Sequence, residues 1–97
     1  MGEYATIKGY KLYYTRDGEA GMPIILIHGT PSASFRWRPV QRLISPFLKT
    51  CAFDLIGMGK SDKPLQGWDY TFINDAHMIA ELMDHLGHEK MIICGDD

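Results

Sequence analysis

The chain has 97 residues and a mass of 11.0 kDa, which is the size of one small domain. Ten Lys and Arg residues and twelve Asp and Glu residues leave a net charge of −2 without any block of like charge. This balance argues against binding to nucleic acid or to a membrane surface. A hydrophobic content of 45% excludes a disordered tail, and no apolar run approaches the roughly 20 residues of a membrane span. Two cysteines are too few for a disulfide framework, so a cytoplasmic location is expected.

The first third of the chain carries three strand signals. Residues 4–7 and 11–15 are short β-favouring runs, and their spacing predicts an antiparallel hairpin. Residues 24–27 are four consecutive branched aliphatic side chains. A run without alternation is typical of a strand buried on both faces, which implies a parallel sheet covered by helices.

Two helices and two further strands are predicted after residue 30. Residues 37–48 have a helical apolar pattern that Pro46 is expected to end or kink. Residues 50–55 and 91–94 are predicted strands, the second of them buried. Between these strands, residues 71–86 predict a helix with Gly87 as its C-terminal cap. Three- and four-residue steps place its buried face at Phe72, Ala76, Ile79, Ala80, Met83 and Leu86. The opposite face then carries Asp75, Glu81, Asp84 and His85.

The order of these elements is a hairpin followed by strand, helix, strand, helix and strand. Such alternation is typical of the α/β class, in which right-handed crossovers build a parallel sheet. The last residues of the chain follow directly on a predicted core strand, and the outer edge of such a strand needs a cover. The expectation is therefore that these 97 residues are the front half of a larger fold.

Three stretches together resemble the N-terminal part of an α/β-hydrolase. They are IHGTP at residues 27–31 with SFRWR at 34–38, FDLIGMGKSDKP at 53–64, and ICGDD at 93–97. The resemblance is greatest to the haloalkane dehalogenases, whose relatives include the epoxide hydrolases and the coelenterazine luciferases. It implies an α/β fold in which an antiparallel hairpin leads into a mostly parallel sheet with helices on its faces.

The resemblance also implies a domain boundary and a strand order. Residues 1–97 would be the N-terminal half of the core domain and end at the nucleophile elbow, without the cap domain and the C-terminal half. The strand at 24–27 would lie between those at 50–55 and 91–94. Cys51 and Cys94 would then be two strands apart, at least about 9.5 Å, which is beyond the roughly 7 Å that a disulfide bridges. No disulfide is expected.

The loop after the 24–27 strand is a candidate oxyanion site. Gly29 permits a close backbone approach, and the N–H of Thr30 can face an oxyanion, as the second donor does in this fold. The alternative is that Gly29 and Pro31 only shape a strand-to-helix loop. In many haloalkane dehalogenases the position of Thr30 is Asn, which helps hold the halide, so Thr30 is a departure. His28 is expected to brace the loop. Phe35 and Trp37 are expected near the pocket entrance, where packing is the commoner role.

The last three residues match the first part of the nucleophile elbow G-x-Nu-x-G, which presents a nucleophile at a strand-to-helix turn. Gly95 and Asp96 precede Asp97, which takes the nucleophile position. Asp96 stands where the family commonly has His. The alternative for Asp97 is an ordinary N-cap of a following helix. A nucleophilic Asp displaces a leaving group from sp³ carbon and forms an alkyl-enzyme ester, which water then hydrolyses.

Other candidate sites are weaker. Gly57 and Gly59 form a G-x-G without the third Gly of a dinucleotide site, and tight loop packing is the better interpretation. Asp54, Ser61 and Asp62 are interpreted as turn hydrogen-bonding residues. The resemblance implies no metal ion and no organic cofactor. A zinc site is also not expected, because the His residues at 77, 85 and 88 lack ligand partners at suitable spacing.

The predicted function is therefore haloalkane hydrolysis, with epoxide hydrolysis as the enzymatic alternative and a small molecule as the substrate. The hypothesis from another class is a catalytically inactive truncated chain. In that case a complementary C-terminal half or self-association would cover the open strand. The substrate itself is expected to depend on the cap domain.

Overall fold

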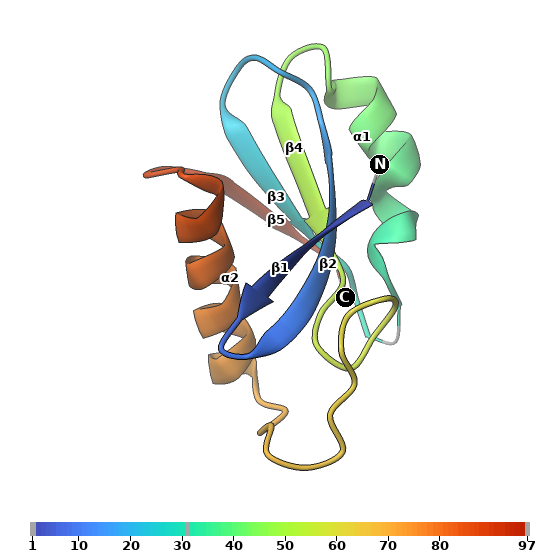
Figure 1. The fold of residues 1–97 in the computed structure, drawn as a ribbon. Helices are drawn as coiled ribbons and strands as arrows, with labels where there is room; N and C mark the ends of the chain where they lie inside the picture. Colours follow the sequence, from blue (N-terminus) through green and yellow to red (C-terminus); the bar gives the residue numbers. More distant parts are fainter. Residues whose placement is uncertain (1, 31, 97) are drawn as a thin grey trace.

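The computed structural model describes residues 2–30 and 32–96. Five strands and three helical segments follow one another along the chain (Figure 1). They are β1 (Gly2–Ile7), β2 (Tyr10–Asp17), β3 (Pro23–Ile27), the 3₁₀ helix η1 (Ser34–Trp37), α1 (Arg38–Ile44), β4 (Lys49–Phe53), α2 (Phe72–Leu86) and β5 (Ile92–Gly95). The hairpin and the alternation of strands and helices are thus confirmed.

The strands form one mixed sheet in the order β1-β2-β4-β3-β5. β1 pairs with β2 and β2 with β4 in antiparallel fashion, whereas β3 is parallel to both β4 and β5. The expected position of β3 between the other two parallel strands is confirmed. Cys51 on β4 and Cys94 on β5 therefore flank β3, and both are free thiols.

The turn between β1 and β2 explains the tight hairpin. Lys8 and Gly9 have φ values of 54° and 84°, which is the backbone of a two-residue type I′ turn. Ile7 pairs directly with Tyr10 across it. The turn thereby fixes a register in which Ala5 and Ile7 point into the core, where both are buried.

Each face of the sheet is covered by one helix (Figure 1). On one face, Met78 and Leu82 of α2 pack on a cluster that includes Ile25 and Phe53. On the other face, a smaller cluster of Ile24, Leu26 and Ala52 is covered by the half-buried side chains Trp37, Ile44 and Leu48. β3 is therefore buried on both faces, as its unbroken aliphatic run predicts.

The first helix is shorter than predicted. The run expected over residues 37–48 is a 3₁₀ turn followed by seven α-helical residues that end at Ile44. Pro46 has no N–H with which to continue the ladder, and the N–H groups of Phe47 and Leu48 both turn back to Ile44 O. The proline therefore ends the helix.

The second helix begins and ends as predicted, but its buried face is different. Thr71 Oγ1 caps its start by accepting from Asn74 N–H at 3.2 Å, and Gly87 ends it with φ 78°. The buried side chains are Met78 and Leu82, whereas Phe72 is 92% exposed. The prediction of that face was right only in part, because Ile79 and Leu86 pack against the core cluster but the fully buried residues are Met78 and Leu82. The helical pattern alone does not say which side meets the sheet.

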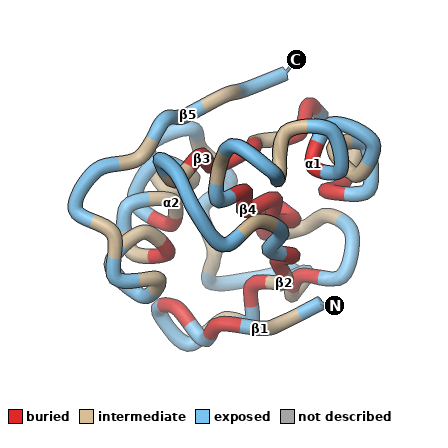
Figure 2. The backbone as a smooth tube through the Cα atoms, turned by 90° about the horizontal axis from the view of Figure 1, so that it is seen from above, coloured by how far each residue is buried: buried red, intermediate tan, exposed pale blue. Residues whose placement is uncertain are grey.

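The edge strand β5 also departs from the prediction. Ile92 and Ile93 are exposed, although the run was expected to be buried. β5 pairs only with β3 among the described strands, so its outer edge is open. Figure 2 shows β5 at the margin of the molecule, whereas many of the buried residues lie on the central strands. In the described part of the chain no helix has the length and apolar character to cross a membrane.

Candidate active site

A cleft of about 270 Å³ opens at the carboxyl ends of β3 and β5. Ligands of open α/β sheets bind at this end of the strands. Its apolar walls are contributed by Ile27, Leu55, Phe72, Ala76 and Ile79. Its polar lining comprises His28, Gly29, Thr30, Asp75 and Asp96. An apolar cleft with a few polar groups at one end suits a small, mainly uncharged molecule.

His28 fixes the start of the loop that borders this cleft. Its Nε2 accepts a hydrogen bond from Leu55 N–H at 3.0 Å, and its Nδ1 lies 2.7 Å from Gly29 O. Because Nε2 accepts, the proton of the neutral ring lies on Nδ1 and is donated to Gly29 O. Both ring nitrogens are thereby used, and the side chain is 2% exposed. The expectation that His28 braces the loop is confirmed.

A buried carboxylate holds the other side of the same loop. Asp54 accepts hydrogen bonds from Ser34 N–H at 2.6 Å and from Lys60 N–H at 2.8 Å. Ser61 donates its hydroxyl to Asp54 O and accepts from Tyr13 N–H. These contacts tie the residues after β3 to those after β4, and they confirm that Asp54 and Ser61 are turn hydrogen-bonding residues.

The two predicted oxyanion-loop residues lie at the cleft. Gly29 is buried and Thr30 is exposed, and both line the cavity. Pro31 and the predicted nucleophile Asp97 lie outside the described residues. Asp96, next to Asp97 in sequence, lines the cleft and donates its N–H to Ile27 O at 3.0 Å. The end of β5 is thus held beside the end of β3.

Phe35 and Trp37 have other surroundings. Neither is among the described residues that line the cleft. Phe35 lines a separate pocket with Arg38 and Lys60, and Trp37 packs against the cluster beneath α1. The indole Nε1 of Trp37 has no hydrogen-bond partner among the described residues.

Asp75 is the cleft residue that the sequence analysis missed. It belongs to the first turn of α2 and was expected on the outer face of that helix, yet it is half-buried in the cleft. Burial raises the pKa of the Asp75 carboxyl above its usual range. Its position four residues after the N-cap Thr71 would have identified it once the inward face of α2 was known.

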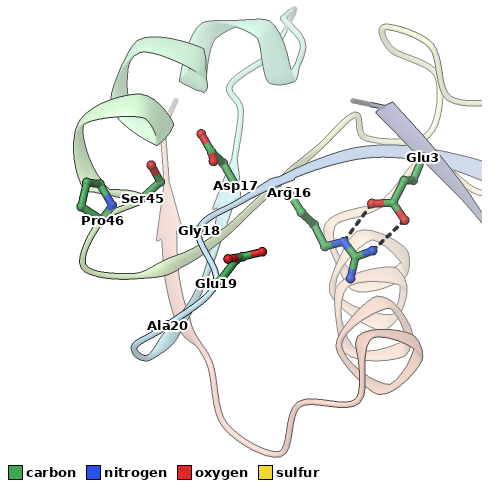
Figure 3. A pocket seen from close by; sticks show the side chains of 8 residues that line it. All are labelled: Glu3, Arg16, Asp17, Gly18, Glu19, Ala20, Ser45 and Pro46. Carbon is green, nitrogen blue, oxygen red and sulfur yellow. Dashed lines mark hydrogen bonds and ion pairs between the residues drawn. The ribbon is translucent and has the colours of Figure 1, made fainter.

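A larger cavity of about 810 Å³ lies at the opposite end of the sheet (Figure 3). It is lined by the loop that precedes β3 and by Ser45 and Pro46 before β4. The Arg16 guanidinium on its wall forms an ion pair with Glu3 at 2.8 Å, which holds the pKa of the Glu3 carboxyl below its usual value. Because this cavity borders the amino ends of the parallel strands, it is not the candidate active site.

In the described part of the chain, no group of three or more His, Cys, Asp or Glu side chains is placed to hold a metal ion. His85 instead lies edge-on to the ring of Tyr14, with 6.4 Å between the ring centroids.

Comparison with known proteins identifies the family. The family model described as the alpha/beta hydrolase fold matches residues 22–97, a span that includes the whole cleft. The chain belongs to the α/β-hydrolase family.

Both expected branches of this hydrolase family are found among the relatives. The hydrolase segment is 37% identical over 94 residues to a soluble epoxide hydrolase from a Corynebacterium species, covering 96% of this chain and 32% of that protein. It is 33% identical to haloalkane dehalogenase 2 of Mycobacterium bovis, covering 90% of this chain and 30% of that one. A solved structure of a haloalkane dehalogenase loop variant from Bradyrhizobium elkanii superposes with a TM-score of 0.90 at 28% identity, over 100% of this chain and 32% of that one. The chain thus spans about a third of the length of these relatives.

Proposed function

We propose that this hydrolase segment supplies the nucleophile, Asp97, and part of the oxyanion hole for hydrolysis at sp³ carbon. The observation that carries the proposal is the parallel pairing of β3 with β5 up to Ile27 and Gly95. This pairing brings Thr30 and Asp96 to one cleft. Asp97 follows Asp96 directly in the sequence.

The proposed reaction has two steps. A carboxylate oxygen of Asp97 attacks the substrate carbon as the bond to the leaving group breaks, and an alkyl-enzyme ester forms. Water then adds to the ester carbonyl, whose developing oxyanion accepts from the Thr30 N–H, and the alcohol leaves as the carboxylate is restored. The second step needs a His base. His28 has both nitrogens engaged with Gly29 O and Leu55 N–H, so we assign the base to another part of the whole protein.

The leaving group distinguishes two candidate substrate classes. A haloalkane is the first, since the cleft beside Thr30 offers an apolar wall to an alkyl chain and the hydroxyl of Thr30 is a halide donor. An epoxide is the second, and the 37% identity to a soluble epoxide hydrolase favours it. Both classes share the attack by Asp97.

The test compares two neighbouring carboxylates in the whole protein. Bromide release from 1-bromobutane and diol formation from styrene oxide are measured for the unmodified protein, Asp97→Asn and Asp96→Asn. Asp97→Asn is expected to lower kcat by about 10³-fold or more, and Asp96→Asn by at most about tenfold. Equal losses, or a larger loss for Asp96→Asn, would contradict the assignment of the nucleophile.

We also propose that the active protein covers the flank formed by α2 and β5 with further secondary structure, from the same polypeptide or from a complementary chain. The support is the open outer edge of β5 among the described strands, together with the exposure of Phe72 and Ile73 on α2 and of Ile92 and Ile93 on β5. The 97-residue chain alone is expected to release no bromide from 1-bromobutane and no diol from styrene oxide. Measurable turnover by the chain alone would refute this requirement.

A further inference from the structure

A second pocket, of about 240 Å³, lies between the start of α1 and the turn that follows β4. Its lining includes Tyr13, Phe35, Arg38, Asp54 and Lys60. None of its lining residues is shared with the cleft at the ends of β3 and β5. We call it the Arg38–Lys60 pocket, and the proposed hydrolase chemistry leaves it without a role.

The carboxylate of Asp54, in the wall of this pocket, forms hydrogen bonds with backbone N–H groups and no ion pair with Arg38 or Lys60. Asp54 is 2% exposed, and its two oxygens accept from the backbone N–H groups of Ser34 and Lys60. Within residues 2–30 and 32–96, the ion pair found joins Arg16 to Glu3. Arg38 and Lys60 both line the pocket, and neither forms an ion pair with a carboxylate among the described residues.

The positive groups are accompanied by aromatic surface. Lys60 Nζ lies 5.0 Å from the centre of the Tyr13 ring, a cation–π contact that holds the ammonium group near the pocket. The ammonium group of Lys63 donates to the carbonyl oxygen of Gly59, which is one of the residues that line the pocket. Phe35 is 66% exposed, so one apolar ring faces solvent next to these cations.

We propose that the Arg38–Lys60 pocket binds the carboxylate of a small aromatic acid. The carboxylate bridges the Arg38 guanidinium and the Lys60 ammonium, and the apolar part of the ligand packs against Phe35. Arg is suited to this role because its planar donors match a carboxylate in pairs. The pocket is below the roughly 300 Å³ at which drug-sized ligand sites begin, so the ligand is a single ring or a branched chain of similar size.

Benzoate is the probe for this site. Titrated into the ¹⁵N-labelled whole protein at low ionic strength, it is expected to shift the amide signals of Ser34, Phe35 and Lys60, with a Kd of roughly 1 mM. Benzyl alcohol has the ring without the charge, acetate has the charge without the ring, and both are expected to bind at least about tenfold more weakly. Inorganic phosphate tests whether the pocket binds any anion, and it is also expected to bind at least about tenfold more weakly than benzoate.

Variants that remove one positive charge each test whether benzoate binds at Arg38 and Lys60. Arg38→Gln and Lys60→Gln are each expected to raise the Kd of benzoate about five- to tenfold. Arg42→Gln removes a charge from an exposed position of the same helix outside the pocket and is expected to change Kd less than twofold. Retention of the dispersed amide spectrum shows that each variant is folded, and the two pocket variants test the site independently.

Several outcomes would overturn the proposal. Equal binding of benzyl alcohol would show an apolar site without charge recognition, and equal binding of phosphate would show a general anion site. A loss in Arg42→Gln as large as in Arg38→Gln would show nonspecific attraction to the whole charge of the chain. Shifts at Gly29 and Thr30 in place of Phe35 would show that benzoate enters the cleft instead.

Discussion

Two buried polar side chains decide the shape of the loop beside the cleft. His28 links Gly29 O to Leu55 N–H, and Asp54 links the backbone of Ser34 to that of Lys60. Neither residue has a spare group for catalysis, since each uses its polar atoms on backbone partners. Their contribution is structural, because they fix the loop that carries Gly29 and Thr30 at the cleft.

The residues of the site could be predicted from sequence only where a local motif defines them. Gly29 and Thr30 follow a strand in a recognisable loop, and the structure brings both to the cleft. Asp75 could not be predicted, because its inward position depends on which side of α2 meets the sheet. Phe35 was expected at the entrance, but η1 carries it to the Arg38–Lys60 pocket.

The two cysteines are expected to react very differently with thiol reagents. Burial raises the pKa of Cys51 to about 12, so that only about one thiol in ten thousand is ionised at pH 8. Cys94 on the edge strand is half-buried. Iodoacetamide at pH 8 should therefore alkylate Cys94 first, and Cys51 only after unfolding in urea. Peptide mass mapping measures both, and equal labelling of the folded chain would contradict the buried position of Cys51.

Asp75 should make stability depend on pH. Because its pKa is raised in the folded state, the folded chain retains a proton that the unfolded chain has lost, and stability falls as pH rises from the unfolded pKa to the folded pKa. Asp75→Asn should therefore be stabilised relative to the unmodified chain at pH 7 and not at pH 3. Solvent keeps the gain to about 0.5 kcal/mol because the carboxyl is only half-buried.

Urea unfolding at the two pH values measures this gain. Asp84→Asn, at an exposed position of the same helix, is the control for removing a carboxylate from α2. A stabilisation of Asp75→Asn that is larger at pH 3 than at pH 7 would reverse the predicted sign and contradict the raised pKa.

At the scale of the elements, two glycines with positive φ allow the cost of backbone strain to be measured apart from the cost of crowding an added side chain. Gly87 ends α2 with φ 78° and has open space where an added methyl group would lie, whereas a Cβ on Gly59, at φ 56°, would lie 2.2 Å from Asp54 Oδ2. Gly87→Ala is expected to cost about 1 kcal/mol, the strain of a left-handed residue. Gly59→Ala should cost about 3 kcal/mol, because it also displaces a buried carboxylate from its hydrogen bonds.

Urea unfolding of these two glycine variants gives both free energies. The same methyl group is added at two left-handed positions, so the difference between them reports the crowding at Asp54. Equal costs would show that the turn after β4 yields to the added group and does not depend on close packing.

The elements themselves differ in how much of them the sequence predicts. Strand positions follow from short apolar runs, and the cap residues Thr71 and Gly87 mark the ends of α2. The end of α1 follows from the proline at residue 46, which has no N–H to continue the helical hydrogen bonds, although the sequence does not show that the last α-helical residue is Ile44. The burial of β5 could not be predicted, because it depends on which neighbours lie beside the strand.

At the scale of the whole molecule, the sheet brings together two loop segments that lie far apart in sequence, one after β3 and one after β5. β3 ends just before the loop of Gly29 and Thr30, β5 ends at Gly95 just before Asp96, and their parallel register brings both ends to one cleft. The antiparallel strands β1 and β2 extend the sheet on the side away from this cleft. The described core therefore brings Thr30 and Asp96, which lie far apart in sequence, to the same cleft.

The most direct test of the account is a single turnover of the whole protein in ¹⁸O-labelled water. If Asp97 forms an ester, the first product carries an unlabelled oxygen from the carboxylate, and the peptide beginning at Met91 gains roughly 2 Da. Fragmentation of that peptide is expected to place the label on Asp97 and not on Asp96. Labelled product together with an unlabelled peptide would show that water attacks the substrate directly, and would contradict the nucleophilic role of Asp97.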